Sequence, residues 1–300
     1  RDFTNKLVWA QALGRTGDWS DADSHGTHVA GSVLGSGSMS TGKYKGVAYQ
    51  AKLVFQSVED SAGGLGGLPE DLNDLFRAAY TNGARIHSDS WGAANAGYYD
   101  ADCRNLDMFV WSNQNMLVVV AAGNEGIDAN SNGVVDADSM DTPGTAKNCL
   151  TVGAAESLRP EFSSYTWGSS WASDYPANPI KDDEISGPYD STNQGMAAFS
   201  SRGPCDDGRI KPDIVAPGTD IASTRSRGTT NTGWGVVSGN TNYLWMGGTS
   251  MATPLTSGAA ALARQWVTTT GGITNPSAAL LKALLINGAR NLSPGQYGTG

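Results

Sequence analysis

Two histidines three residues apart open the first motif that could carry chemistry, Ser24-His-Gly-Thr-His-Val-Ala-Gly31. The helix motif of zinc proteases needs a glutamate directly after its first histidine, and this sequence has Gly26 in that place. A histidine buried only for packing would not need such small neighbours. An imidazole at a helix entrance, where glycine lets other segments approach closely, suits a catalytic base. We therefore interpret His25 as a general base.

A serine lies in the middle of the second motif, Gly247-Gly-Thr-Ser-Met-Ala-Thr-Pro254, which leads into a helix of small residues. Ser250 would then lie in the first turn, where its backbone N–H and the positive end of the helix dipole face a developing oxyanion. The alternative is that Ser250 only caps the helix, since serine is a favoured N-cap. The Gly-x-Ser-x-Gly turn of the α/β-hydrolases is absent, because Ala252 replaces its second glycine.

The third motif is a buried strand that runs into a turn, Val118-Val-Val-Ala-Ala-Gly-Asn124. Asparagine after glycine is common in turns for conformational reasons alone. However, a side-chain amide at the C-terminal end of a strand in an open α/β sheet is well placed to donate to an oxyanion. The sequence therefore offers Asn124 as an oxyanion-hole donor.

Apolar strands alternate with amphipathic segments along the chain. We predict strands at 52–58, 85–90, 116–121, 149–153 and 213–216, and helices at 69–80, 103–112, 250–267 and 276–287. Repeated strand–helix–strand units predict a three-layer α/β fold, with a mostly parallel central sheet and helices on both faces. Residues 156–195 break this rhythm, and we interpret them as a long surface insertion pinned by its own aromatic residues. An aromatic carbohydrate-binding patch is the alternative.

In this order, the three motifs strongly resemble the subtilase family of serine proteases. Gly66-Gly-Leu-Pro69, Phe199-Ser-Ser-Arg-Gly-Pro204 and Asp207-Gly-Arg-Ile-Lys-Pro-Asp213 look most like its alkaline branch, which bears a C-terminal β-domain. The resemblance covers nearly the whole chain apart from residues 156–195. It implies that residues 1–300 form a single subtilisin-like catalytic domain, a serine endopeptidase acting through an acyl-enzyme. The roles it implies are nucleophile for Ser250, general base for His25 and oxyanion donor for Asn124.

The resemblance also implies which segments bind the protein or peptide substrate. One wall of the primary specificity pocket would be Ser90, Trp91 and Gly92, and the opposite wall would be Ala121, Ala122 and Gly123. The edge that pairs with the extended substrate by β-augmentation would be Leu65, Gly66 and Gly67. Glu125 resembles a residue at the pocket floor, where it would admit polar or basic side chains alongside apolar ones.

One member of the triad has no counterpart in this sequence. The family places an aspartate, followed by Ser/Thr-Gly, at the end of a buried strand before the catalytic histidine. Here only 24 residues precede His25, and Asp2, Asp18, Asp21 and Asp23 follow no apolar strand. We therefore expect an upstream or separate segment to supply the aspartate that orients the imidazole. We also expect the family's C-terminal closing segment to lie beyond residues 295–300.

Two other function classes follow from the same residues. Without the aspartate, the domain could be a peptide-binding pseudoprotease that does not cleave. A serine on a helix N-terminus could also serve a different serine hydrolase, such as an esterase. Reaction with a sulfonyl active-site reagent separates the first class from a protease, and a comparison of peptide with ester substrates bears on the second.

Oxygen-bearing side chains alternate along residues 128–136 in the pattern of an EF-hand calcium loop. The candidate ligands are Asp128, Asn130, Asn132 and Asp136. Gly133 and Val135 fit the glycine and apolar positions of such a loop. Its twelfth position is Ser139 in place of glutamate, flanked by Asp138 and Asp141. A polar turn is the alternative, and we predict a structural calcium ion.

Composition excludes several classes. The formal net charge is −9, and no Lys/Arg block could follow a phosphate backbone, so we expect no nucleic-acid partner. The sequence has no run of eighteen apolar residues, which predicts no membrane-spanning helix. The acidity favours a secreted, extracellular protein. The three cysteines are Cys103, Cys149 and Cys205, of which Cys149 should be buried and a Cys103–Cys205 bridge is one arrangement.

Overall fold

Four parallel strands form the centre of the computed structural model, which describes residues 1–187 and 195–292. Their order is β10 (Ile214–Pro217), β7 (Leu150–Ala155), β5 (Leu117–Ala121) and β3 (Ile86–Asp89). Both faces of this sheet are covered, so β5 and β7 are buried along their whole length and read as apolar runs without alternation. The predicted α/β architecture with a parallel central sheet is confirmed.

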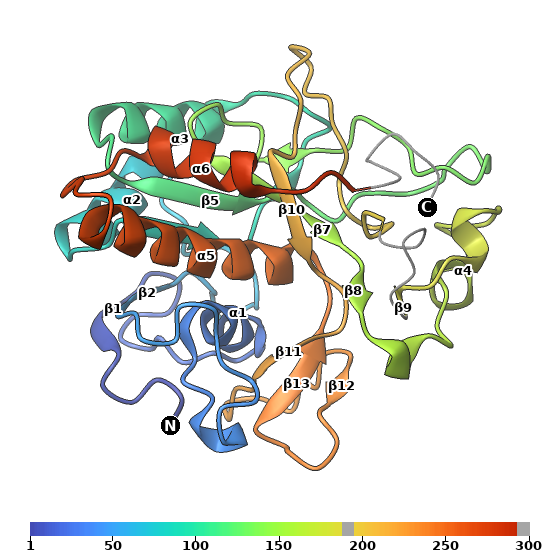
Figure 1. Ribbon diagram of the computed structural model, residues 1–300, viewed down its shortest axis with the longest axis horizontal. Coiled ribbons are helices and arrows are strands. Elements are labelled where there is room, and N and C mark those ends of the chain that lie inside the picture. The colour runs from blue at the N-terminus through green and yellow to red at the C-terminus, as the bar shows by residue number, and fades with distance from the viewer. Residues whose placement is uncertain (188–194, 293–300) are drawn as a thin grey trace.

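Helices lie on both faces of the sheet. Figure 1 shows α3 (Ala101–Ser112) on one side of β5 and the long α5 (Thr249–Thr269) on the other. α1 (His25–Leu34) packs against α5, and α2 (Leu72–Thr81) packs against α3. The last described helix, α6 (Ala278–Gly288), also contacts α5. The predicted positions of α5 and α6 agree with the structure to within two residues.

The N-terminal strands form a separate sheet. β1 (Leu7–Ala12) and β2 (Leu53–Ser57) pair in parallel, and β2 has no second partner among the described residues. β2, α2 and β3 make a strand–helix–strand crossover, which predicts that β2 and β3 run in the same direction. However, the two strands do not pair, and the outer edge of β3 has no partner strand in the described part of the chain. The parallel sheet is therefore interrupted between β2 and β3.

A cavity of about 760 Å³ lies along this interruption. β2 and β3 line it, together with the helical residues Val29, Val33, Leu75, Ala79 and Ala261. The side chains of the two strands meet at one point, where His87 Nε2 donates to Gln56 Oε1 at 3.2 Å. At the C-terminal ends of the strands the same cavity is bordered by His25 and Ser90. We call it the interstrand cavity.

Smaller elements complete the fold. An antiparallel sheet of β11 (Ile221–Thr224), β13 (Tyr243–Met246) and β12 (Gly235–Val236) packs beside α1. β4 (Ala93–Ala94) pairs with β6 (Asp141–Thr142), and β8 (Ser157–Leu158) pairs with β9 (Ser186–Gly187). Short helical turns lie at Ser38–Ser40, Pro160–Phe162, Trp167–Ser170 (α4) and Ile180–Asp182. None of the described helices is long and apolar enough to cross a membrane.

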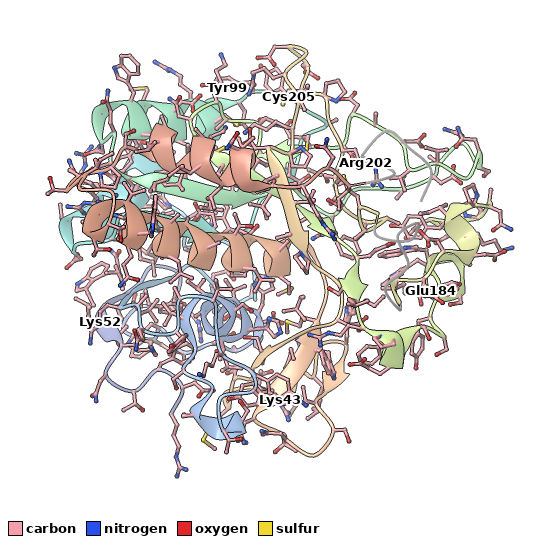
Figure 2. The ribbon with its side chains drawn as sticks, in the orientation of Figure 1. Lys43, Lys52, Tyr99, Glu184, Arg202 and Cys205 are labelled. Carbon is pink, nitrogen blue, oxygen red and sulfur yellow. The ribbon has the colours of Figure 1, made fainter. Side chains whose placement is uncertain are left out.

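The described part of the 156–195 segment projects beside the sheet and carries only short elements (Figure 1). Its Trp167 is fully buried, stacks on Trp171 at 5.7 Å and meets Tyr175 edge-on at 5.6 Å. Arg202 is buried where this segment meets the body of the molecule, and it donates to the Ala198 carbonyl (Figure 2). The rings of Trp167, Trp171 and Tyr175 thus pack on one another, whereas Tyr165 is 56% exposed. The packed rings fit a segment held by its own aromatic residues.

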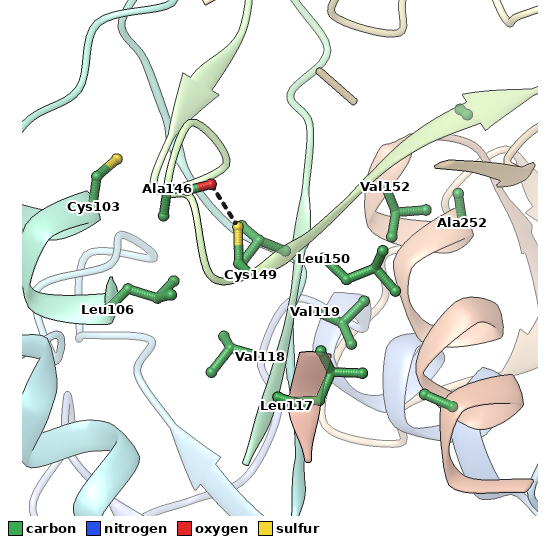
Figure 3. Packing of buried hydrophobic residues seen from close by; sticks show 14 of the residues in the cluster. Cys103, Leu106, Leu117, Val118, Val119, Ala146, Cys149, Leu150, Val152 and Ala252 are labelled. Carbon is green, nitrogen blue, oxygen red and sulfur yellow. Dashed lines mark hydrogen bonds between the residues drawn. The ribbon is translucent and has the colours of Figure 1, made fainter. Parts of the chain in front are cut away.

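All three cysteines are buried and free. Cys149 lies in the core between α3 and the sheet, where its thiol donates to the Ala146 carbonyl at 3.3 Å (Figure 3). Cys103 Sγ lies 2.9 Å from Thr145 Oγ1. The conceivable Cys103–Cys205 bridge is therefore not formed, while the buried environment predicted for Cys149 is confirmed.

Candidate active site

Ser250 occupies the first turn of α5, directly beside the C-terminal end of β3. Its hydroxyl donates to the Ser90 carbonyl at 3.1 Å, and the Ser90 hydroxyl donates to the Ser250 carbonyl at 2.9 Å. Gly248 precedes the helix with φ 140°, a conformation that side chains rarely adopt. The glycine turn and the paired hydrogen bonds together place Ser250 at the N-terminus of a 21-residue helix.

The Asn124 side chain lies next to this helix entrance and is fixed by Thr249. Asn124 Oδ1 accepts from the Thr249 backbone N–H at 2.9 Å and from its hydroxyl at 3.1 Å. No described residue accepts a hydrogen bond from the Asn124 amide nitrogen, and the side chain is exposed. The NH₂ group is therefore a free donor beside Ser250, as an oxyanion hole requires.

His25 is the first residue of α1. Ser24 precedes it with φ 85°, and its buried hydroxyl accepts from the Ser226 N–H at 3.0 Å. Burial lowers the pKa of His25, and the neighbouring carboxylates of Asp23 and Asp21 oppose that shift. The imidazole is thus held neutral at neutral pH, which is the form that a general base needs.

His28 is positioned differently and has a structural role. It is fully buried, and its Nε2 donates to the Ile221 carbonyl at 2.9 Å, which ties α1 to β11. Burial lowers its pKa to about 4, so it stays neutral above that pH. Of the two motif histidines, only His25 borders the interstrand cavity.

No described carboxylate orients the His25 ring. Asp21 caps α1 instead, because its carboxylate accepts from the backbone N–H groups of Ser24 at 2.7 Å and Thr27 at 2.6 Å. Asp23 accepts from the Asn231 amide at 2.9 Å. The Ser250 hydroxyl points to Ser90, and no hydrogen bond between Ser250 and His25 is present in the described structure. The structure thus brings Ser250 and Asn124 together, but it shows no hydrogen bond from His25 to either of them among the described residues.

The two predicted walls of the specificity pocket lie at the ends of neighbouring strands, close to Ser250. The wall 90–92 follows β3, and the wall 121–123 ends β5, its neighbour in the sheet. The predicted substrate edge at 65–67 is a loop with Leu65 and Gly66 exposed and Gly67 buried. Gly66 N–H donates to the Asp60 carboxylate at 3.1 Å, and Gly67 N–H donates to the Val58 carbonyl at 2.9 Å. These two N–H groups are used within the loop, and β-augmentation at this edge stays a prediction.

The sequence motifs gave no indication of Asp141 in the pocket. In the sequence, Asp141 only flanks the predicted calcium loop, but its carboxyl group lies between the two walls, against Gly123 and Gly92. Burial and the nearby Glu125 raise the pKa of Asp141 to about 7. No local pattern marks this residue, because β4 and β6, which place it, are two residues long each.

The predicted calcium loop is a tight turn whose carboxylates bind its own backbone. Asp128 is buried and accepts from the N–H groups of Asn132 and Gly133, both at 2.9 Å. Asp136 accepts from the Asn130 amide and from the Ala129 N–H. Among the residues that the structure describes, no cluster of three His, Cys, Asp or Glu side chains could hold a metal ion. The asparagine oxygens would have to complete the ligand set.

The fold and this site define the class of protein. The model of the subtilase family matches residues 8–300, so the chain belongs to that family of serine endopeptidases. Its branch within the family stays a prediction.

Three similar proteins show how far the likeness extends. The serine protease/ABC transporter B family protein tagD of Dictyostelium discoideum is 31% identical, over 90% of this chain and 18% of its own length. The serine protease AprX of Bacillus subtilis is 32% identical, over 93% of this chain and 56% of its own. The solved structure of sphericase has a TM-score of 0.62 at 22% identity, over 98% of this chain and 87% of its own. The chain thus spans about a fifth of the length of tagD and just over half of the length of AprX.

Proposed function

We propose that this domain hydrolyses peptide bonds as an endopeptidase, through an acyl-enzyme on Ser250. Ser250 Oγ attacks the carbonyl carbon of the scissile bond, and His25 takes its proton and passes it to the leaving amine. Asn124 Nδ2 and the Ser250 N–H stabilise the oxyanion. The observation that carries this proposal is the Asn124 amide, whose oxygen is fixed by Thr249 while its NH₂ group stays free beside Ser250.

The test is covalent titration of the protein, expressed from its complete gene, with a sulfonyl fluoride. We expect one modified residue, Ser250 by peptide mass spectrometry, and parallel loss of peptide hydrolysis. Ser257→Ala is the matched control on the same helix, and it should be modified as the parent is, whereas Ser250→Ala should not. Labelling without peptide hydrolysis, but with ester hydrolysis, would favour the esterase. Absence of both labelling and hydrolysis would favour the pseudoprotease.

We propose further that a parallel β-strand outside the described residues fills the interstrand cavity. The interstrand cavity has a volume of about 760 Å³ and is lined by both strands over most of their length. β2 and β3, which line it, each have one edge that pairs with no strand among the described residues, and backbone N–H and C=O groups need hydrogen bonds when buried. A strand parallel to its neighbours would end at the edge of the sheet where His25 lies. An aspartate at that end is the group the imidazole lacks.

The calcium site is a separate proposal. The turn at Asp128 and Gly133 brings Asn130 and Asp136 into contact, which supports a shared set of oxygen ligands. Calcium bound there would stabilise the folded state by mass action. We expect excess chelator to lower Tm, and Asp128→Ala to remove most of the calcium-dependent part of Tm. Equal Tm values with calcium and with chelator would rule the site out.

The physiological partners are proposed to be protein or peptide substrates outside the cell. The acidic composition, with a net charge of −9, and the absence of a basic block support this setting. Separating culture medium from cells and measuring the protein in each fraction tests the location. Recovery only from the cell fraction would contradict secretion.

A further inference from the structure

We infer that the primary specificity pocket selects lysine or arginine at the residue whose carbonyl is attacked, with Asp141 as the specificity-determining carboxylate. The inference rests on the proposed peptidase function and adds its substrate class.

Asp141 reaches the space between the pocket walls from β6. Its backbone N–H donates to the Ala122 carbonyl at 3.0 Å, which fixes it against one wall. A Cβ atom built on Gly123 would lie 2.3 Å from Asp141 Cγ, and one built on Gly92 would lie 3.4 Å from Asp141 Cβ. Gly123 therefore leaves room for this carboxyl group, whereas a Cβ on Gly92 would meet the Thr142 carbonyl, at 2.7 Å, before it met Asp141. The carboxyl group thus lies against both walls and is buried.

The carboxyl group has no partner in the described structure. Asp141 is 7% exposed, and its buried Oδ1 has no hydrogen-bond donor. The charged group that acts on it is a second acid, Glu125, and the carboxylate of Asp100 nearby is already bonded to the Thr142 hydroxyl. Buried polar atoms are nearly always satisfied, so an unpaired carboxylate oxygen beside another acid indicates a missing donor. A cation brought by the substrate would supply it.

A lysine or arginine side chain fits the rest of the pocket. Its methylene stem can pack on the apolar walls, which include Trp91, Ala121 and Ala122, while the charged end reaches Asp141. A metal ion fits less well, because no cluster of three suitable side chains exists among the described residues. The second acid, Glu125, is exposed and would add long-range attraction for the same charge.

The first experiment compares peptide substrates that differ only at the residue before the scissile bond. We expect kcat/KM for lysine or arginine to exceed that for methionine by roughly 10- to 100-fold, the usual effect of a hydrogen bond to a charged group. Asp141→Asn should reduce the lysine-to-methionine ratio by about the same factor. Glu125→Gln, the control, should reduce it less. A ratio that Asp141→Asn leaves intact would overturn the inference, because a merely structural role would lower both substrates together.

The second experiment needs no variant. Because the pKa of Asp141 is raised to about 7, its carboxylate is charged above that pH and protonated below it. The lysine-to-methionine ratio should therefore rise as pH increases through about 7, while titration of His25 cancels from the ratio. If the enzyme cleaves peptides but the lysine-to-methionine ratio of kcat/KM stays near one at every pH, the basic preference is wrong and the proposed function is not affected. An enzyme that neither cleaves peptides nor reacts with the sulfonyl fluoride would instead contradict the proposed function.

Discussion

Ser250 and Asn124 lie beside four continuous strands, whereas His25 begins a helix that borders the interstrand cavity. On the nucleophile side, Ser90 and Ser250 exchange two hydrogen bonds, and Thr249 fixes the Asn124 amide. On the base side, no described residue bonds to the imidazole. The nucleophile side is thus preorganised, and the base side is not.

The difference has a cause in the sheet. α1 is well tied where it meets β11, because the Ser223 hydroxyl donates to the His28 carbonyl at 2.8 Å and the Thr224 hydroxyl to the Thr27 carbonyl at 2.7 Å. On the side of α1 that faces the cavity, the described part of the chain provides no neighbouring strand to match β11. The orientation of His25 therefore depends on the strand that borders α1. A strand placed in the cavity should orient His25 as firmly as Ser250 and Asn124 are oriented.

The largest expected effect comes from supplying that strand. We expect a peptide of apolar strand residues ending in Asp-Ser/Thr-Gly to raise both the stability and the peptidase activity of residues 1–300. The same peptide with Asp→Asn should raise stability alone, because it restores the backbone hydrogen bonds without the negative charge. In subtilisin, loss of the triad aspartate lowers kcat about 3 × 10⁴-fold, and we expect a difference of that order between the two peptides.

Thermal unfolding and single-turnover acylation measure the two effects separately. A scrambled peptide of equal composition is the control, and it should change neither. Full activity of residues 1–300 without any added peptide would contradict the proposal, and it would assign the aspartate role to Asp18, Asp21 or Asp23.

The next effect tests the preorganised side. Asn124→Ala should lower kcat by about 10²–10³-fold with little change in KM, because the amide acts chiefly on the developing oxyanion. The control variant is Asn275→Ala. Asn275 is exposed, and its side-chain oxygen accepts from the Asn115 amide. Steady-state kinetics of the two variants measure kcat and KM, and Asn275→Ala should leave both unchanged. Near-normal kcat in Asn124→Ala would remove this residue from the oxyanion hole.

Much of the fold was predictable because its signals are local. The long helix was expected at 250–267 and spans Thr249–Thr269, since small residues follow a glycine turn. The helix expected at 69–80 begins later, at Leu72, because the Asp71 side chain caps it by accepting from the Asn73 N–H. The proline at position 69 indicates a helix start in the sequence, but the cap at Asp71 sets the start in the structure.

The site was predictable to the extent that its residues lie in contiguous motifs. Asn124 directly follows Gly123, Ser250 lies two residues after Gly248, and the intervening Thr249 bonds to the Asn124 side chain. Asp141 could not be found in this way, because its place depends on β4 pairing with β6 across almost fifty residues. Two-residue strands carry no periodic signal. The interruption between β2 and β3 likewise shows only once the pairing of the strands is known.

A smaller effect concerns the pH dependence of acylation. Burial lowers the pKa of His25 from its ordinary value of 6.5, so the imidazole is neutral and active above that lowered value and is lost as a base below it. The acidic limb of kcat/KM, measured on a methionine substrate, should therefore lie below pH 6.5 with the Asp→Asn peptide. It should move to higher pH with the aspartate peptide, since a carboxylate beside the ring stabilises the imidazolium. Superimposable limbs with the two peptides would mean that the strand does not reach His25.

The smallest effect is expected from oxidation of Met251, which follows the nucleophile in the preorganised half. Met251 is only 1% exposed and packs with Ile221, Leu244 and Met246, whereas Met108 on α3 is 49% exposed. Mild peroxide should therefore convert Met108 to its sulfoxide first, without loss of activity, and Met251 only later. Once formed, a sulfoxide beside Ser250 places a polar group in an apolar cluster and should lower kcat a few-fold. Peptide mass spectrometry against residual activity gives the order of events, and Met251→Leu should abolish the late loss. If activity is lost early and in step with Met251 oxidation, the start of α5 must open readily to solvent. The surroundings of Ser250 would then be less rigid, relative to those of His25, than the hydrogen bonds indicate.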